Sequence, residues 1–194
     1  KLIRYVDDIY LRFGAPVQIY GEDEETITRI EKKAVLADLR FIPSRLRHLG
    51  SGRTLDVLQA MEDYLTGQGV EIHTGETCAE LLVENGRVAG VRTGNGREIP
   101  ASFVILAPGR QGAEWLAREA ARLGLRTRVN PVDIGVRVEL PAEVMAGLTS
   151  VLYEGKFVFY SRFFEDRVRT FCMCPHGEVV MENNGGLITV SGHS

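Results

Sequence analysis

The chain has 194 residues, of which 44% are apolar and 25% are charged, and its formal net charge is −3. This balance is typical of a globular domain and argues against a surface that binds nucleic acid or an anionic membrane. No stretch approaches the roughly 18 apolar residues of a membrane span, and the small number of cysteines fits a reducing compartment better than a disulfide scaffold. We therefore expect a cytoplasmic protein that folds as one or two domains.

Two helices are predicted at the start of the chain. Residues 1–13 space their apolar side chains for one helical face, and the run Gly14-Ala15-Pro16 ends that helix. Asp23 and the two glutamates after it open a second helix, because acidic side chains favour the positive end of the helix dipole. Neither helix carries a pattern that indicates chemistry, so we interpret both as a helical cover on a sheet.

Residues 41–54 form a basic segment rich in glycine and serine. Its cationic or titratable side chains are Arg45, Arg47, His48 and Arg53. A helix is predicted from Leu55 to Thr66 with Thr54 as its N-cap, so the segment could bind an anion at a helix N-terminus. A solvated loop whose arginines pair with surface acids explains the same pattern, and the sequence leaves both interpretations open.

The strongest local signals lie between Gly69 and Gly112. The dipeptides Asn85-Gly86 and Asn95-Gly96 favour tight hairpin turns, because glycine and asparagine tolerate a positive φ. The strand predicted before them is Val70–Ile72, and the segments predicted to pair as an antiparallel meander are Cys78–Glu84, Arg87–Thr93 and Arg97–Ser102.

A buried strand is predicted directly after the meander. The run Phe103–Ala107 has no polar alternation, which is typical of a strand covered on both faces in a parallel sheet. It ends at Pro108-Gly109-Arg110, where a loop leaves the carboxyl end of the predicted strand. Ligands of open α/β sheets bind at such strand ends, so this loop is a candidate binding site.

A helix is predicted over residues 112–123. Arg118, Arg122 and Arg126 recur every four residues along one face. We interpret that face as solvated rather than as a phosphate-binding surface, because acidic residues stand beside the arginines. Trp115, the only tryptophan, is interpreted as packing in the core or at a domain interface.

Beyond residue 125 the chain consists of short β-prone runs joined by turns. The predicted strands are Val132–Leu140, Lys156–Phe163, Val168–Met173, Glu178–Glu182 and Leu187–Ser191, and a short helix is predicted at Ala142–Leu148. Turns such as Pro175-His176-Gly177 connect neighbouring runs. The pattern predicts a mostly antiparallel sheet.

Cys172 and Cys174 form a Cys-x-Cys pattern in one of these runs. In an extended strand the two thiols share a face, with Cα atoms about 6.6 to 6.8 Å apart at the edge of disulfide reach. His176 extends the pattern toward a soft-metal or redox site, but two sulfurs and one imidazole do not close a zinc site. Core packing, a substrate-side thiol and metal binding remain as alternatives, and we predict no metal site.

These features, taken in order, resemble a known family. This chain has a helix followed by GVEI, GRVAGV and FVILAPG. That order resembles the second half of the FAD-binding domain of glutathione-reductase-type flavoproteins. The similarity narrows to the FAD-dependent dehydrogenase-like proteins, over essentially the whole chain, through RFGAP, FIPSRLRHLG, NPVDIGVRVE, RTFCMCP and GEVV…SGHS. Such proteins are more than twice as long and open on a strand followed by G-x-G-x-x-G, which does not occur here. We therefore interpret the chain as an internal segment.

The resemblance implies a fold class that mixes α/β and α+β structure. Residues 1–124 would hold the helical cover and the second half of a Rossmann-like FAD-binding domain, with the meander within residues 69–112. Residues 125–194 would form a β-rich, mostly antiparallel substrate or cap domain.

The resemblance also implies site residues. Cys78 would contact the adenine of FAD through main-chain atoms, so we interpret its thiol as inert. The ribose and pyrophosphate would be approached by Ala107, Pro108, Gly109 and Arg110, and the isoalloxazine by the stretch from Gly50 to Arg53. The substrate-side candidates are Arg47, His48, Cys172 and Cys174. The sequence identifies no catalytic residue.

Two functional hypotheses follow. In the first, the chain is the middle segment of an FAD-dependent oxidoreductase, a dehydrogenase, and is inactive and without retained FAD when alone. Its partners would be a small-molecule substrate of unknown identity and a second copy in a homodimer, with no nucleic acid and no membrane. In the second, the chain is a free-standing α+β binding or scaffold module without redox activity.

Overall fold

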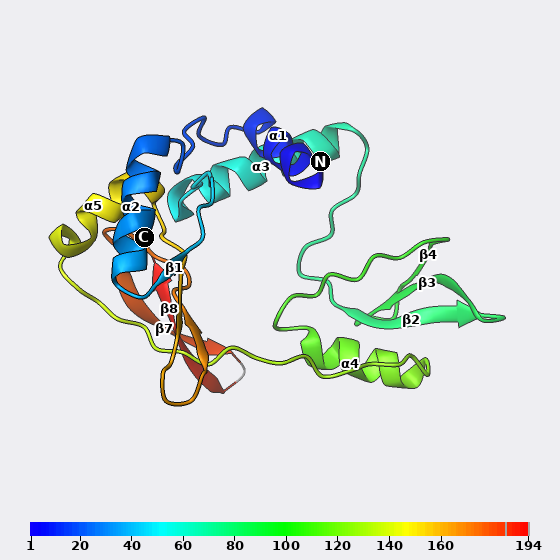
Figure 1. Ribbon diagram of the computed structural model, residues 1–194. Coiled ribbons are helices and arrows are strands. Elements are labelled where there is room, and N and C mark those ends of the chain that lie inside the picture. Colours follow the sequence, from blue (N-terminus) through cyan, green and yellow to red (C-terminus); the bar gives the residue numbers. More distant parts are fainter. Residues whose placement is uncertain (185, 194) are drawn as a thin grey trace. The chain divides into compact units, whose positions relative to one another are not determined.

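A computed structural model describes residues 1–184 and 186–193, with the side chains of residues 51 and 184 excepted. The described residues form five α-helices and three small antiparallel sheets, a mixed α+β architecture (Figure 1). They group into two compact units. Unit 1 comprises Lys1–Gly69, Val136–Glu182 and Val190–Ser194, and unit 2 comprises Val70–Gly135 and Asn183–Thr189. None of the described helices has the length and apolar content that a bilayer crossing requires.

The helices of unit 1 form where helices are predicted, with ends that differ from the predicted ones by up to four residues. They are α1 (Leu2–Arg12), α2 (Glu24–Leu36), α3 (Ser51–Gly67) and α5 (Ala142–Leu152). Asp23 caps α2, because its carboxylate accepts a hydrogen bond from the Thr26 N–H at 3.1 Å. Helix α3 begins four residues before the predicted Leu55, with Gly50 as its N-cap, so Arg53 lies in its first turn.

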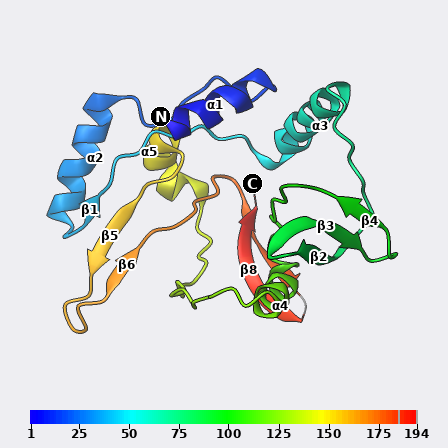
Figure 2. The same cartoon turned by 90° about the vertical axis from the view of Figure 1, so that its right-hand side faces the viewer.

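The core of unit 1 lies between α2, α5 and a three-stranded sheet (Figure 2). The antiparallel strands are β1 (Arg40–Phe41), β5 (Phe157–Tyr160) and β6 (Arg167–Arg169), in that order across the sheet. The rings of Phe41 and Phe157 face each other across β1 and β5, with centroids 5.2 Å apart. Ala34 and Leu152 are buried beside Phe41.

The last two strands form a separate two-stranded sheet. They are β7 (Glu178–Asn184) and β8 (Leu187–His193). At their turn, the Gly186 N–H donates to the Asn183 side-chain oxygen at 2.9 Å. The predicted turn also includes Gly185, which lies outside the described residues.

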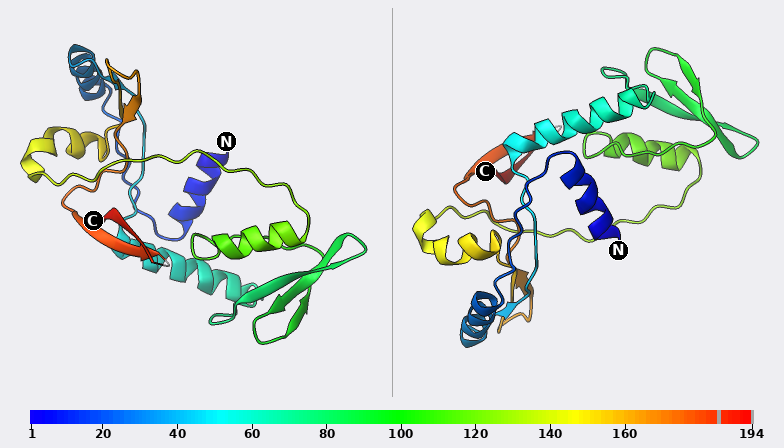
Figure 3. Two further views of the ribbon diagram at one scale, coloured as in Figure 1. Left: turned by 90° about the horizontal axis from the view of Figure 1, so that it is seen from below. Right: turned by 90° about the horizontal axis from the view of Figure 1, so that it is seen from above.

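Unit 2 is built on the meander, drawn in green in Figure 3. Its antiparallel strands are β2 (Cys78–Glu84), β3 (Arg87–Thr93) and β4 (Glu98–Pro100). At the first corner Asn85 and Gly86 have φ of 51° and 76°, and at the second Gly96 has φ of 89°. Both Asn-Gly corners therefore join adjacent antiparallel strands, and this prediction is confirmed.

The pairing of β3 with β4 depends on a glycine in the middle of β3. Gly90 lies opposite Pro100 and has no side chain to occupy the space between the strands. A Cβ atom at this position would overlap the carbonyl oxygen of Ile99. The close approach of the two backbones therefore requires glycine here.

The parallel strand predicted at Phe103–Ala107 is not formed, and the described residues contain no parallel strand pairing. Phe103 and Ile105 are 90% and 94% exposed. A central strand of a parallel sheet needs hydrogen-bonded neighbours and a cover on both faces, and among the described residues this run has no strand beside it. The expected Rossmann-like sheet is therefore not seen.

Other predicted strands differ for a related reason. Val70–Ile72 and Val132–Leu140 lie outside any strand, and Val168–Met173 is reduced to β6. In the run Val132–Leu140, two polar side chains bond to the backbone of other segments. Arg137 donates to the Cys172 carbonyl at 2.8 Å, and Glu139 accepts from the Val179 N–H at 2.6 Å. The run 132–140 therefore contacts other segments through side chains, and it lies in no described backbone ladder.

Candidate functional site

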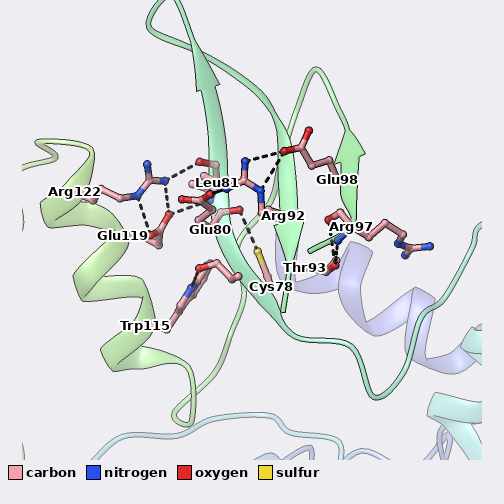
Figure 4. A network of polar contacts seen from close by, with 11 residues as sticks. Cys78, Glu80, Leu81, Arg92, Thr93, Arg97, Glu98, Trp115, Glu119 and Arg122 are labelled. Carbon is pink, nitrogen blue, oxygen red and sulfur yellow. Dashed lines mark hydrogen bonds and ion pairs between the residues drawn. The ribbon is translucent and has the colours of Figure 1, made fainter. Parts of the chain in front are cut away.

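Helix α4 (Ala113–Arg122) packs along β2 through side chains that bond to the strand backbone (Figure 4). The carboxylate of Glu119 accepts a hydrogen bond from the Leu81 N–H at 2.9 Å. Arg122 donates to the carbonyl oxygen of the same residue at 2.7 Å. Because β2 is an edge strand, these two side chains take hydrogen bonds that a neighbouring strand would otherwise make.

Glu119 is a charged side chain in a buried position. Its carboxylate accepts two hydrogen bonds from Arg122, at 2.7 and 3.0 Å. These bonds lower the pKa of Glu119, the Leu81 N–H lowers it further, and burial opposes both. Glu119 is therefore held as a carboxylate that joins α4 to the meander.

One more contact connects α4 and β2, and Cys78 makes a further contact within the strand. The indole N–H of Trp115 donates to the Ala79 carbonyl at 2.8 Å. Cys78, at the start of β2, directs its sulfur toward the Glu80 carbonyl at 3.8 Å. Burial raises the pKa of the Cys78 thiol and the charge of Glu119 adds to this effect, so the thiol stays protonated. These properties agree with an inert thiol, and the predicted adenine contact of Cys78 stays a prediction.

One face of α4 and the candidate turn line an open, shallow pocket of about 590 Å³. Its lining residues are Ala107, Pro108, Gly109, Ala113, Leu116, Ala117, Ala120 and Thr127. All belong to unit 2, and this described lining contains no charged side chain. The structure thus brings together the first three residues of the predicted ribose and pyrophosphate site, and Arg110 follows in the same turn.

Two glycines shape this pocket. Gly109 has a φ of 64°, and no described atom lies within 4 Å of the position that its Cβ would take. A Cβ on Gly112, the N-cap of α4, would overlap the Pro108 ring. Glycine at position 112 therefore lets the turn fold onto the helix, and Gly109 has the left-handed backbone conformation that favours glycine.

The remaining predicted site residues belong to unit 1. Arg47 is largely buried and forms a bidentate ion pair with Asp7, at 2.7 and 3.0 Å, and it also donates to the Pro16 carbonyl. This pairing lowers the pKa of Asp7, chiefly through the hydrogen bonds. Arg47 therefore connects α1 to the loop that follows it, and its substrate-side role stays a prediction.

His48 is paired with a tyrosine that the sequence did not indicate. Its Nε2 lies 2.8 Å from the Tyr153 hydroxyl, and the two rings stack with centroids 3.9 Å apart. Burial lowers the pKa of His48, which favours the neutral imidazole. Gly50 lies close by, because a Cβ at Gly50 would be 3.4 Å from that same Nε2.

Cys172 and Cys174 lie next to each other in a stretch outside any strand. Met173 between them points elsewhere, since its sulfur accepts a hydrogen bond from the Gly155 N–H at 3.3 Å. In the described part of the chain, no group of three or more histidine, cysteine or acidic side chains is arranged to hold a metal ion.

The most important residues that sequence reasoning missed are Glu119, Tyr153 and Arg137. Glu119 precedes Arg122 by three positions, a spacing that favours an ion pair on a helix, but nothing in the sequence indicated that the pair would bond to a strand. Tyr153 and Arg137 meet His48 and Cys172 from distant parts of the chain, and one sequence gives no signal for such contacts.

The described site is thus an apolar pocket beside a glycine turn, in a protein of mixed α+β architecture. No family model matches the chain. Over 74 residues, or 37% of its length, the chain is 42% identical to the tRNA uridine 5-carboxymethylaminomethyl modification enzyme MnmG of two strains of Thermus thermophilus. The match spans only 12% of the length of these relatives, so the similarity is to a part of MnmG.

Proposed function

We propose that the chain is part of an FAD-dependent oxidoreductase, a dehydrogenase, and contributes part of the FAD site and a substrate-side domain. The observation that carries this proposal is the pocket at Ala107–Gly109, the turn at which the family resemblance expects the ribose and pyrophosphate. The partial similarity to MnmG supports a relation to a much longer enzyme. Its tRNA substrate does not enter the proposal, because the match spans 12% of that enzyme.

The chemistry of the pocket lining suits the uncharged portion of a dinucleotide. Alanine and leucine side chains of α4 offer an apolar wall, and Thr127 supplies a hydroxyl that can bond to a sugar. Gly109 leaves its backbone accessible at the edge of the pocket. When FAD is bound, the flavin supplies hydride or electron transfer, and these residues bind and shield the cofactor.

The alternative function is a binding or scaffold module of α+β type without redox activity. The observation that favours it is the lack of a parallel sheet among the described residues. Both functions use the same pocket, so the ligand distinguishes them.

Flavin content tests the proposal directly. The polypeptide that carries this sequence is isolated from its natural host, and absorbance is recorded across the flavin bands before and after addition of FAD. We expect flavin absorbance with the natural polypeptide and weak or no binding of FAD by the 194-residue chain alone. A natural polypeptide that is colourless and takes up no FAD would leave only the binding-module function.

A matched pair of glycine variants tests the pocket itself. Gly109 and Gly124 have nearly equal φ, 64° and 66°, and open space at the Cβ position, but only Gly109 is among the lining residues. Replacing either by alanine adds a similar backbone strain of about 1 kcal/mol. We expect Gly109→Ala in the natural polypeptide to weaken FAD binding roughly tenfold, because Gly109 lines the pocket and an added methyl group would crowd a bound cofactor. Gly124→Ala should bind FAD like the unmodified protein; equal FAD affinity for both variants would contradict the assignment.

A further inference from the structure

The Cys172 and Cys174 side chains form a pair within unit 1. Cys172 acts on the Cys174 thiol and raises its pKa, so the two side chains lie near each other. Both cysteines are free, and Cys172 is exposed while Cys174 is half-buried. The backbone from residue 170 to residue 174 belongs to no strand, so no ladder of hydrogen bonds fixes the two Cα atoms at the full extended spacing.

The surroundings of Cys174 close over one side of the pair. Gly192 of β8 packs so tightly against it that a Cβ there would lie 2.7 Å from the Cys174 sulfur. The Cys174 carbonyl accepts a hydrogen bond from the Gly177 N–H at 3.0 Å, which holds a turn directly after the pair. The Cys174 thiol is therefore partly covered, whereas Cys172 is exposed.

One cation, Arg137, lies near the pair. Arg137 donates to the Cys172 carbonyl at 2.8 Å, and its guanidinium passes 3.4 Å from the Cβ position of Gly192. Burial raises the pKa of Cys174, as do Cys172 and the more distant Glu154, while the positive charge of Arg137 acts in the opposite direction. A thiolate formed at this pair therefore has a cation beside it.

We propose that Cys172 and Cys174 are a reversible two-thiol redox site that exchanges with small disulfides and closes into a disulfide within the chain. Two adjacent thiols without a third ligand among the described residues suit this chemistry better than a closed metal site. The site lies in unit 1 and uses no residue of the α4 pocket, so the thiol chemistry can be tested without flavin.

The exchange proceeds in two balanced steps. The thiolate of Cys172 attacks one sulfur of the small disulfide, forms a mixed disulfide and releases one thiolate, which takes up a proton. The thiolate of Cys174 then attacks the Cys172 sulfur, breaks the mixed disulfide and releases the second thiol. The pair has lost two electrons and two protons, and the small disulfide has been reduced to two thiols.

The test uses the native 194-residue chain without any flavin. The protein is incubated with glutathione disulfide, free thiols are alkylated, and tryptic peptides are weighed by mass spectrometry. No lysine or arginine follows Arg169, so both cysteines fall on one C-terminal peptide, whereas Cys78 falls on another. We expect the C-terminal peptide to lose two hydrogens and to carry no alkyl group. This closed form should exceed the mixed disulfide by roughly tenfold, because the second step is intramolecular.

Single substitutions supply the controls. With Cys172→Ser or Cys174→Ser, the remaining thiol can give only an alkylated or a mixed-disulfide peptide, whereas Cys78→Ser should behave like the unmodified chain. Added dithiothreitol should return the closed form to two alkylated cysteines. A C-terminal peptide of the unmodified chain that carries two alkyl groups, two mixed disulfides or a link to a second chain would overturn the proposal.

Discussion

At the scale of single residues, Glu119 shows how a charged side chain can take a backbone hydrogen bond that a neighbouring strand would otherwise make. It brings a negative charge to a position only 6% exposed, and it is held there by Arg122 and by the Leu81 backbone. Donors on both sides satisfy the carboxylate, which is the condition under which a buried charge is tolerated. The attachment of α4 to β2 therefore depends on the charge state of Glu119.

The lowered pKa of Glu119 predicts a pH dependence for unit 2. The unfolded chain takes up the proton first, near the usual pKa of 4.5, so the stability that Glu119 contributes is lost as pH falls from there through the lower folded value. Glu119→Gln has no such charge to lose and should flatten that part of the profile. Trp115, which lies in unit 2, reports the unfolding midpoint by its fluorescence.

The control for this experiment is Glu114→Gln on the same helix. The Glu114 side chain is 94% exposed and pairs with Arg118 only at 4.0 Å, so the variant should keep the acid sensitivity of the unmodified chain. If the pH–stability profile of Glu119→Gln ran parallel to those of Glu114→Gln and the unmodified chain, the Glu119 carboxylate would have no part in the acid response.

At the scale of elements, the meander is the part of the fold that a local sequence signal determines most directly. We expect Gly90→Ala to destabilise unit 2 by about 1–3 kcal/mol, because the new methyl group overlaps the Ile99 carbonyl and separates β3 from β4. Denaturant unfolding followed by Trp115 fluorescence measures the loss. Gly86→Ala, at a corner with open space, carries only backbone strain of about 1 kcal/mol. Equal losses for the two variants would contradict a steric cause.

The elements that could be predicted are those whose signals are local. Asp23 indicated the start of α2, and the Asn-Gly dipeptides indicated the corners of the meander, because caps and tight turns depend on a few neighbouring residues. The run Phe103–Ala107 reads as a buried strand, but a strand forms only where a partner lies beside it. Side-chain bonds from Arg137 and Glu139 hold the run 132–140, and alternation alone did not reveal them.

The candidate site was predictable only in part. The Pro108-Gly109 turn stood out because such a turn after an apolar run is a frequent ligand position, and it does line a pocket. The helix that completes the pocket was predicted with Leu116 and Ala120 facing inward, but the sequence did not indicate that this face would lie against the turn. Tyr153 beside His48 is separated from it by 105 positions in the sequence, and such a contact follows from packing rather than from a pattern.

At the scale of the whole molecule, many large apolar side chains of the described residues are exposed. Phe103 and Ile105 are exposed, and so are the alternate apolar residues of the run 132–140. Exposed apolar surface of this kind promotes association with other surfaces. The behaviour of the chain in solution should therefore depend on these runs more than on its modest net charge.

Phe103→Ser tests this expectation. Because Phe103 is 90% exposed, the change should alter the stability of unit 2 by less than about 0.5 kcal/mol, while self-association measured by sedimentation decreases. Val91→Ser, in the middle of β3, provides the contrast and should cost about 1–2 kcal/mol. A large loss of stability on Phe103→Ser would mean that this side chain is packed in a core.

The attachment of α4 to the edge of β2 has a consequence for misassembly. Strands at sheet borders recruit foreign strands through vacant peptide groups, and here the Leu81 peptide is already engaged on both its N–H and its carbonyl. The other border, β4, is three residues long and ends in Pro100, which has no N–H to offer. Both edges of the meander are thus protected against the addition of further strands. Aggregation of this chain should therefore begin at its exposed apolar runs, residues 103–107 and 132–140.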